Sequence, residues 1–508
     1  MSKKIVVDYL KSNKPEDIDV GFLGYLSSLS KVAEVSPETA ASIVKELSDQ
    51  RKNLKLIASE NYSSLNTQLA MGNLLTDKYA EGFPGHRFYA GCDNIDEIES
   101  LAAEQACKLF NCDHAYLQPH SGADANLIAY WAVLNTRIEL PGLEEIGETN
   151  PSKLSREDWG SLRNKLGNQK ILGLDYYSGG HLTHGYRHNV SARMFDSYTY
   201  SVDRETGLLD YNEIEKMAME IKPLILLTGY SAYPRKINFK RMREIADKID
   251  AVFMVDMAHF AGLVAGGVFT GDYNPVPFAH IVTTTTHKTL RGPRGGMILC
   301  VEEFREAVDK GCPLVIGGPL PNVMAAKGVA LKEANSPEFK SYAGKVADNA
   351  KYFCEVCIQN GMTIATDGTD NHLFLIDVRN YGLTGRQAES VLRECGITLN
   401  RNSLPFDQNG PWYTSGLRIG TPAITTLGMG KPEIDLIAKS IAVVLEAAEP
   451  ALIQKGDRAG QKSKAKYNIP GDIIKSVRAN IEKLLTDFPV YPELDLEYLE
   501  KAFKTKPV

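Results

Sequence analysis

Short apolar, β-branched runs alternate with longer helical segments through the middle of the chain. Between about residues 65 and 335 such runs lie at 223–233, 251–260 and 280–288, and each ends in polar residues. Strands that alternate with helices predict a mostly parallel α/β sheet, in which ligands bind beyond the carboxyl ends of the strands. Asp256 and Lys288 both fall at such ends. We therefore expect their side chains to face one crevice.

The first 64 residues are predicted to form an N-terminal arm. Ser36 is a suitable N-cap, and Pro37 fits the first position of a helix that we expect to run to about Leu54.

Three further parts follow the arm. Residues 65–335 are predicted to form a large domain, with a folded insertion at about 139–170 whose short helix starts after Ser155. Alternating segments resume beyond it and predict a smaller α/β domain over residues 336–454. Residues 455–508 are Lys-rich and then helical, and we interpret them as a C-terminal extension.

Composition and charge narrow the class of protein. The 508 residues are 43% hydrophobic and 24% charged, which is typical of a globular protein with more than one domain. The formal charge of -6 argues against a nucleic-acid partner, since such proteins usually carry a basic surplus. The apolar stretch at the N-terminus is too short for a signal peptide or a membrane span. We therefore expect a cytoplasmic protein with neither nucleic acid nor membrane as partner.

The cysteines point to the same compartment. Eight are scattered along the chain without a compact framework, which favours reduced thiols. Cys354 and Cys357 form one C-x-x-C, but a structural zinc site would need four ligands. We interpret them as two cysteines on one helix and expect no metal.

Three motifs carry candidate chemistry. A turn of small residues at 118–126 follows a short strand and opens a helix, so its backbone N–H groups and the Ser121 hydroxyl make a candidate phosphate cradle, although a plain helix cap would have the same pattern. Asp256 alone is equally compatible with a metal ligand, a base, a counter-ion or a structural carboxylate. Lys288 follows four threonines and is flanked by His287, Arg291 and a Gly-rich turn, and cationic neighbours lower the pKa of an amine.

Together the three motifs fit one cofactor. Pyridoxal phosphate requires an imine-forming lysine, a carboxylate beside its pyridinium nitrogen and an anion cradle for its phosphate. Lys288, Asp256 and the turn at 118–126 would supply these groups. A negative charge beside the ring nitrogen favours the protonated, electron-accepting form of the ring.

The chain also resembles the serine hydroxymethyltransferase family. The resemblance rests on strings that occur in order between residues 50 and 450: LIASENY (56–62), DKYAEGFPGHRFYAGC (77–92), QPHSGADAN (118–126), SGGHLTHG (178–185), VDMAHFAGLV (255–264), TTTTHKTLRGPRGG (283–296), TDNHLFL (369–375) and SGLRIGTPAIT (415–425). It implies a fold-type I, aminotransferase-like enzyme that works as a homodimer or tetramer with shared active sites.

The resemblance further implies roles for individual residues. Catalytic residues would be Lys288, which forms the internal aldimine, Asp256, His181, Glu81, Tyr79 and Thr286. The cofactor would be bound by Ser121, Gly122, Ala123, His181, Ser231, Asp256, His259, His287, Lys288, Gly317 and Gly318. The amino-acid substrate would contact Ser59, Tyr79, Glu81, Tyr89 and Arg418, and the folate would contact Glu81, Gly180, Leu182 and Asn402.

The implied reaction converts serine and tetrahydrofolate to glycine and 5,10-methylenetetrahydrofolate, reversibly, through an aldimine and a quinonoid. A folate-independent aldolase of β-hydroxy amino acids is the alternative within the same fold. An inactive relative serving as an RNA-binding or scaffold protein is the alternative from another class, but it should have lost Lys288, Asp256 or Arg418.

Three segments depart from the family pattern. Ala123 stands where a second phosphate-binding serine is common, and losing a hydrogen bond to a charged group costs about 1.5–3 kcal/mol. Val315 and Ile316 interrupt a loop that is usually richer in glycine and reaches a neighbour's phosphate, and Tyr176 replaces an aliphatic residue on the folate side. We therefore expect changes in cofactor affinity, cross-subunit contact and folate affinity.

Overall fold

The structure, a computed structural model, describes residues 2–504. Its largest part is a seven-stranded sheet with the order β4-β10-β9-β8-β7-β5-β6. The strands are β4 (His114–Tyr116), β5 (Lys170–Leu174), β6 (Asp196–Tyr200), β7 (Ile225–Gly229), β8 (Val252–Asp256), β9 (Ile281–Thr285) and β10 (Gly296–Cys300). The pairs from β6 to β9 are parallel, and only β10 runs antiparallel to its neighbours. The prediction of a mostly parallel sheet is confirmed.

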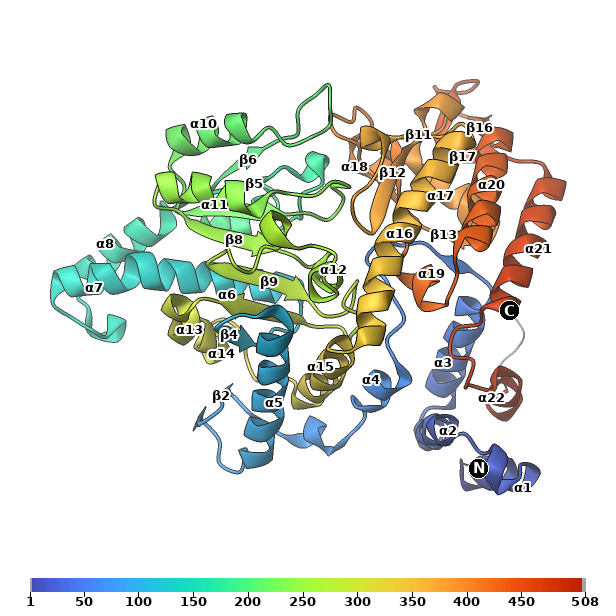
Figure 1. The fold of residues 1–508 in the computed structure, drawn as a ribbon, viewed down its shortest axis with the longest axis horizontal. Helices are drawn as coiled ribbons and strands as arrows, with labels where there is room; N and C mark the ends of the chain where they lie inside the picture. The colour runs from blue at the N-terminus through green and yellow to red at the C-terminus, as the bar shows by residue number, and fades with distance from the viewer. Residues whose placement is uncertain (1, 505–508) are drawn as a thin grey trace.

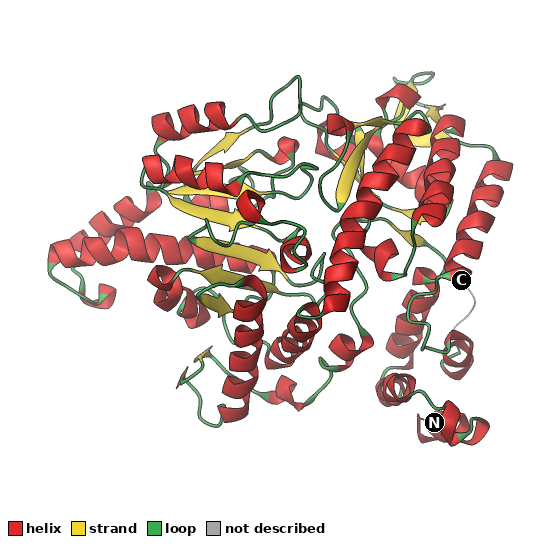
Figure 2. Ribbon diagram, viewed as in Figure 1, coloured by secondary structure: helices red, strands yellow, loops and turns green. Residues whose placement is uncertain are grey.

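Helices cover both faces of this sheet (Figure 2). Alternation along β8 explains why: Val252 and Met254 pack into one buried cluster, whereas Phe253 and Val255 pack into the other. The first cluster includes residues of α6 (Gly122–Leu134) and α13 (Glu302–Asp309). The second includes residues of α5 (Asp93–Phe110), α10 (Tyr211–Ile221), α11 (Phe239–Lys248), α12 (Ala261–Ala265) and α15 (Pro321–Ala334).

The insertion extends α6 away from the sheet at the left of Figure 1. It contains α7 (Leu140–Ile146) and α8 (Arg156–Gly167). Ser155 is the N-cap of α8 and accepts a hydrogen bond from the Asp158 N–H at 3.1 Å, as predicted.

A second, smaller sheet lies in the C-terminal half, beside the long helix α16 (Pro337–Gln359), against which it packs (Figure 1). Its four strands are antiparallel in the order β11-β12-β15-β14. The strands are β11 (Thr363–Ile364), β12 (Leu373–Asp377), β14 (Asn400–Asn402) and β15 (Gly416–Gly420), and they are packed with α17 (Gly385–Glu394) and α20 (Lys431–Ala447). Cys354 and Cys357 both lie on α16 and are buried in this core.

The two ends of the chain share one apolar cluster. It joins α1 (Ser2–Ser12), α2 (Val20–Val32) and α3 (Pro37–Gln50) to α22 (Leu496–Ala502). Before α22 come the hairpin of β16 (Glu449–Leu452) and β17 (Lys462–Asn468), and then α21 (Gly471–Asp487). Other short elements include β2 (Gly82–Phe83), β3 (His86–Arg87), α4 (Leu65–Leu69), α9 (Ser191–Met194), α14 (Gly311–Leu314), α18 (Gly410–Tyr413) and α19 (Pro422–Thr426).

The predicted end of the third helix was wrong. Helix α3 ends at Gln50, because Leu54 and Lys55 form β1, which pairs in parallel with β13 (Ile397–Thr398). Ser36 occupies the N-cap position, but its hydroxyl contacts the side chains of Glu38 and Thr39 instead of a backbone N–H. None of the helices over residues 2–504 combines the length and apolar character needed to cross a membrane.

Candidate active site

A cavity of about 710 Å³ opens beyond the carboxyl ends of β7, β8 and β9. Most of the residues predicted for the site line it. These are Ser59, Ser121, Gly122, Ala123, Gly180, His181, Leu182, Ser231, Asp256, His259, His287, Lys288, Asn402 and Arg418. Residues from both sheets thus converge on one cavity.

The other predicted residues do not line this cavity. They are Tyr79, Glu81, Tyr89, Thr286, Gly317 and Gly318. Thr286 is buried, and its hydroxyl donates to the Pro293 carbonyl at 2.5 Å. The rings of Tyr79 and Tyr89 lie 4.8 Å apart and are about half exposed. A Cβ added to Gly318 would lie 3.1 Å from the Tyr79 ring, so this loop neighbours the tyrosines of its own chain.

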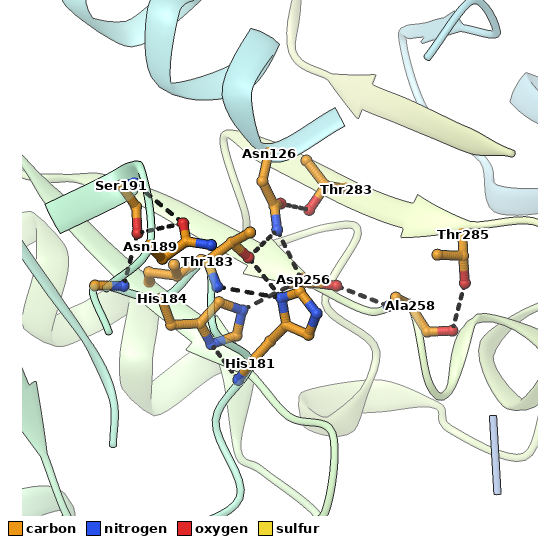
Figure 3. Close-up of polar contacts among 12 residues, drawn as sticks. Asn126, His181, Thr183, His184, Asn189, Ser191, Asp256, Ala258, Thr283 and Thr285 are labelled. Carbon is orange, nitrogen blue, oxygen red and sulfur yellow. Dashed lines mark hydrogen bonds and ion pairs between the residues drawn. The ribbon is translucent and has the colours of Figure 1, made fainter. Parts of the chain in front are cut away.

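Asp256 is held by a hydrogen-bond network at the end of β8 (Figure 3). Its Oδ2 accepts from Asn126 Nδ2 at 2.9 Å and lies 3.2 Å from His184 Nε2, while its Oδ1 accepts from the Ala258 N–H at 3.0 Å. Asn126 Oδ1 in turn accepts from the Thr283 hydroxyl at 2.6 Å. The carboxylate therefore has a fixed orientation.

The network also sets the charge of Asp256. Burial alone would raise the pKa of this carboxyl. The hydrogen bond of His184, the charges of His184 and His181 in their protonated forms, and the hydrogen bond from Asn126 together lower the pKa well below its usual value. Asp256 is therefore ionised throughout the neutral range and can stabilise a positive charge in the cavity.

Lys288 lies just past β9, the strand next to β8. Burial lowers the pKa of its amine to about 8, the nearby Asp256 opposes this shift, and the charges of Arg418 and Arg294 add to it. Its backbone carbonyl accepts from Asn61 Nδ2 at 3.0 Å. Lys288 thus combines a fixed backbone with an amine that is more readily deprotonated than a surface lysine.

The predicted cradle lies at the start of α6. Ser121 is the N-cap, and its Oγ accepts from the Asp124 N–H at 3.2 Å. A Cβ at Gly122 would lie 2.7 Å from Thr285 Cγ2, so a larger residue would clash with β9. Backbone N–H groups at a helix N-terminus bind anions, and the cradle, amine and carboxylate together match the three groups that pyridoxal phosphate requires.

Arg418 reaches the cavity from β15 of the smaller sheet. Its Nη1 donates to the Ser231 carbonyl at 2.6 Å, and its Nε donates to Asn400 Oδ1 at 3.1 Å. Burial lowers the pKa of its guanidinium to about 10, so it stays charged at neutral pH. A fixed, charged guanidinium is suited to binding a carboxylate through two parallel hydrogen bonds.

The histidines of the cavity are neutral at neutral pH. Burial is the main cause that lowers the pKa of His181 to about 4 and that of His287 to about 3, and it also lowers the pKa of His259. The Nδ1 of His259 lies 3.1 Å from Nε2 of His372, and the two rings stack. These rings can therefore orient a ligand by stacking and hydrogen bonding without adding charge.

Several residues that shape the site had no role assigned from the sequence. They are Asn126, Thr183, His184, Thr283, His372 and Asn400. Asn126, Thr183, His184, Thr283 and His372 belong to the sequence strings quoted above, so their position in those strings was the available signal. Asn400 belongs to none of them.

The departures from the family pattern also have definite positions. Ala123 and Tyr176 both line the cavity. Ile316 is buried in the apolar cluster on the α6 face of the large sheet, and Val315 packs against that cluster. The side chains of Val315 and Ile316 thus anchor the loop that carries Gly317 and Gly318.

Comparison with known proteins agrees with this geometry. A family model described as serine hydroxymethyltransferase matches residues 32–147 and 164–441, leaving out part of the insertion. Curated proteins of that name are 61% identical in Treponema pallidum (100% of this chain, 88% of the relative), 56% in Salinispora tropica (93% and 98%) and 54% in Mycolicibacterium smegmatis (96% and 97%). The chain belongs to the serine hydroxymethyltransferase family, whose fold-type I architecture its central sheet displays.

Proposed function

We propose that this chain transfers the hydroxymethyl carbon of serine to tetrahydrofolate, reversibly, giving glycine and 5,10-methylenetetrahydrofolate. The observation that carries the proposal is that the Lys288 amine and the Asp256 carboxylate lie at the ends of neighbouring strands and line one cavity. The family match supports the folate-dependent reaction, and none of the relatives compared above is an aldolase. The presence of Lys288, Asp256 and Arg418 argues against an inactive scaffold.

Members of the family use pyridoxal phosphate as cofactor and tetrahydrofolate as co-substrate. When bound, pyridoxal phosphate supplies an aldehyde and a ring that accepts electrons from the substrate Cα. Ser121, Gly122 and His287 would hold its phosphate, and His181, Ser231 and His259 would contact its ring. Asp256 would face the ring nitrogen and stabilise its positive charge.

Lys288 would act as the amine that carries the cofactor and as a proton carrier at Nζ. With a pKa of about 8, about a tenth of the amine is neutral at pH 7, several hundred times more than for an ordinary lysine. A neutral amine is the nucleophilic form, so burial prepares Lys288 for exchange with the substrate amine.

Arg418 would bind the carboxylate of serine or glycine, with Ser59 beside it. Binding at this point orients the amino acid with its Cα near Lys288 and Asp256. Glu81 would hold or accept the proton of the serine hydroxyl when the one-carbon unit leaves. Gly180, Leu182 and Asn402 would contact tetrahydrofolate, and Leu182 is 41% exposed, as a residue at an entrance should be.

Assembly as a homodimer would complete the site. Glu81, Tyr79, Tyr89, Gly317 and Gly318 line no part of the cavity in their own chain, and Phe88 beside them is 69% exposed. In a symmetric dimer this surface would meet the partner's cavity and would supply the missing groups. The eight free cysteines fit the reducing cytoplasm, where we place the enzyme.

Two measurements test the proposed function. The purified protein with pyridoxal phosphate should show a visible absorbance band, and Lys288→Ala should lack it. Borohydride should bleach this band by reducing the imine to an amine, which leaves the cofactor fixed to the peptide carrying Lys288. Adding tetrahydrofolate to enzyme and serine should strongly accelerate glycine formation. A band without any effect of tetrahydrofolate would point to the aldolase, and no band at all would refute both functions.

A further inference from the structure

Lys327 is a buried lysine to which the proposed reaction assigns no role. It lies on α15 with 2% of its surface exposed. Its Nζ donates to three backbone carbonyls: Leu117 at 2.6 Å, Gly296 at 2.8 Å and Pro119 at 3.0 Å. An ammonium group has three N–H donors, so these three acceptors match them one for one.

This arrangement is unusual because no carboxylate neutralises the amine directly. Within residues 2–504, Lys327 takes part in no ion pair shorter than 4.0 Å, and Glu99 is bonded to Arg87 and Gln118 instead. Removing an unpaired ammonium from water costs several kcal/mol. A lysine retained under such conditions calls for a function that uses its charge or its donors.

The three carbonyls belong to the segments that build the phosphate cradle. Leu117 and Pro119 lead from β4 into Ser121 and Gly122, and Gly296 begins β10. The Gly296 N–H donates to the Pro119 carbonyl at 2.9 Å, so the amine fixes two segments that also bind each other.

His287, the third residue expected to hold the phosphate, is connected by hydrogen bonding to the same part of the backbone. The Thr286 N–H, one residue before His287, donates to the Gly295 carbonyl at 3.1 Å. A Cβ on Gly295 would lie 2.4 Å from Lys327 Cε, and a Cβ on Gly296 would lie 2.2 Å from the Ser121 carbonyl. Glycine at 295 therefore lets the lysine approach from behind, and glycine at 296 lets the start of β10 lie against the Ser121 carbonyl of the cradle.

We propose that Lys327 is a positioning residue for the cofactor phosphate. Its ammonium group fixes the backbone of the cradle and places a positive charge behind it. The inference rests on the proposed function, since it concerns the phosphate of the same cofactor. Two electrostatic effects support it. Burial lowers the pKa of Lys327 to about 7, while the charges of Glu99 and of Asp124 in the first turn of α6 oppose this shift. A phosphate anion in the cradle would add to that opposition, because a nearby opposite charge favours the ammonium form. The charge of Lys327 in turn contributes to lowering the pKa of His287, so it acts across the cradle.

The experiment compares two cofactor forms that differ only in the phosphate. Wild-type protein, Lys327→Met and Lys327→Gln are stripped of cofactor and titrated with pyridoxal phosphate and with pyridoxal, following the visible band. Methionine keeps an unbranched chain without charge or N–H donors, and glutamine keeps two donors. Lys332→Met, an exposed lysine on the same helix, is the matched control.

We expect Lys327→Met to weaken pyridoxal phosphate binding by about 10- to 100-fold, as for loss of a charged group, while pyridoxal affinity changes less than about twofold. Inorganic phosphate should raise the Tm of the wild-type apoprotein more than that of the variant, and Lys332→Met should behave as wild type. Equal losses for the two cofactor forms would mean a merely structural lysine and would overturn the inference, as would no loss at all.

Glutamine keeps the test decisive if the methionine variant does not fold, because the same ratio of the two affinities is then measured on Lys327→Gln. If wild-type protein binds neither form, the proposed function itself fails. If wild type binds both forms and the ratio of the two affinities is the same in the variants as in wild type, the inference about Lys327 fails while the proposed function stands.

Discussion

The Asp256 side of the cavity and the Tyr79 surface differ in how far one chain completes them. Around Asp256, the partners of the carboxylate come from α6, from the loop after β5 and from the turn after β8, and all belong to the same chain. Tyr79 and Tyr89 are 53% and 47% exposed and do not line the cavity that holds Asp256. The difference teaches that one chain completes the Asp256 side by folding, whereas the roles proposed for Tyr79 and Tyr89 require assembly with a second chain.

Mixing two inactive variants should give the largest effect, because activity returns from almost none. It tests directly whether one site uses groups from two chains. Lys288→Ala and Glu81→Gln are each expected to be almost inactive as homodimers. Mixing them in equal amounts should restore about a quarter of wild-type activity, since half of the dimers are mixed and each mixed dimer has one intact site. Activity of the refolded or co-expressed mixture, divided by total protein, is the measurement.

The matched control mixes Lys288→Ala with Asp256→Asn, two changes on the same side of the site. Every site in that mixture carries one of the two changes, so no activity should return. Recovery in both mixtures, or in neither, would contradict the assignment of Glu81 to the partner's cavity.

Asp256→Asn should have the next largest effect. The amide has the shape of the carboxylate but cannot stabilise a positive charge, so we expect kcat to fall by about 10³-fold or more while the protein still folds. Steady-state kinetics together with the absorbance of bound cofactor check this. A fall below about tenfold with full cofactor content would show that the buried charge is not needed.

Arg418→Lys should weaken substrate binding more than it slows the reaction. A lysine keeps the charge but loses the planar pair of donors and the bonds to Ser231 and Asn400, so the KM for serine should rise about 10- to 100-fold. Arg401→Lys is the control, because Arg401 is paired with Glu389 at the same cavity. A similar rise in KM for both variants would refute a specific role for Arg418.

Local sequence patterns were sufficient to predict the Asp256 side of the cavity. The features that could not be predicted depend on contacts between residues far apart in the sequence. Strand alternation and helix caps depend on neighbouring residues, so the ends of β8 and β9 and the start of α6 could be located from the sequence. The end of α3 depended on the pairing of Leu54 with Ile397, which no local signal reveals. No local signal distinguishes Lys327 from a surface lysine, because its three acceptors come from distant segments.

The pH dependence of apoprotein stability should show a smaller effect, on the order of 1–3 kcal/mol. Lys288 has a pKa of about 8 in the folded protein and an ordinary, higher pKa when unfolded. Between these values the unfolded chain binds more protons, so stability should increase as the pH rises from 8 toward 10. Lys327, with a pKa of about 7, adds a slope of the same sign.

Lys288→Met isolates the contribution of Lys288. Urea unfolding of the two apoproteins at several pH values should show a shallower rise for the variant. Identical slopes would mean that the Lys288 amine is not shifted by burial, and would weaken the account of its reactivity.

Ala123→Ser should have the smallest effect, and it should strengthen binding. Ala123 lines the cavity in the first turn of α6, where a hydroxyl could donate one further hydrogen bond to the cofactor phosphate. At the lower end of the range for a charged acceptor such a bond contributes about 1.5 kcal/mol, so the Kd for pyridoxal phosphate should fall about tenfold while the Kd for pyridoxal stays unchanged. The double variant with Lys327→Met sharpens the result. If the two changes in the binding free energy of pyridoxal phosphate add, the serine acts on the phosphate directly. If the serine no longer strengthens binding, Lys327 must hold the cradle in place before the hydroxyl can bind the phosphate.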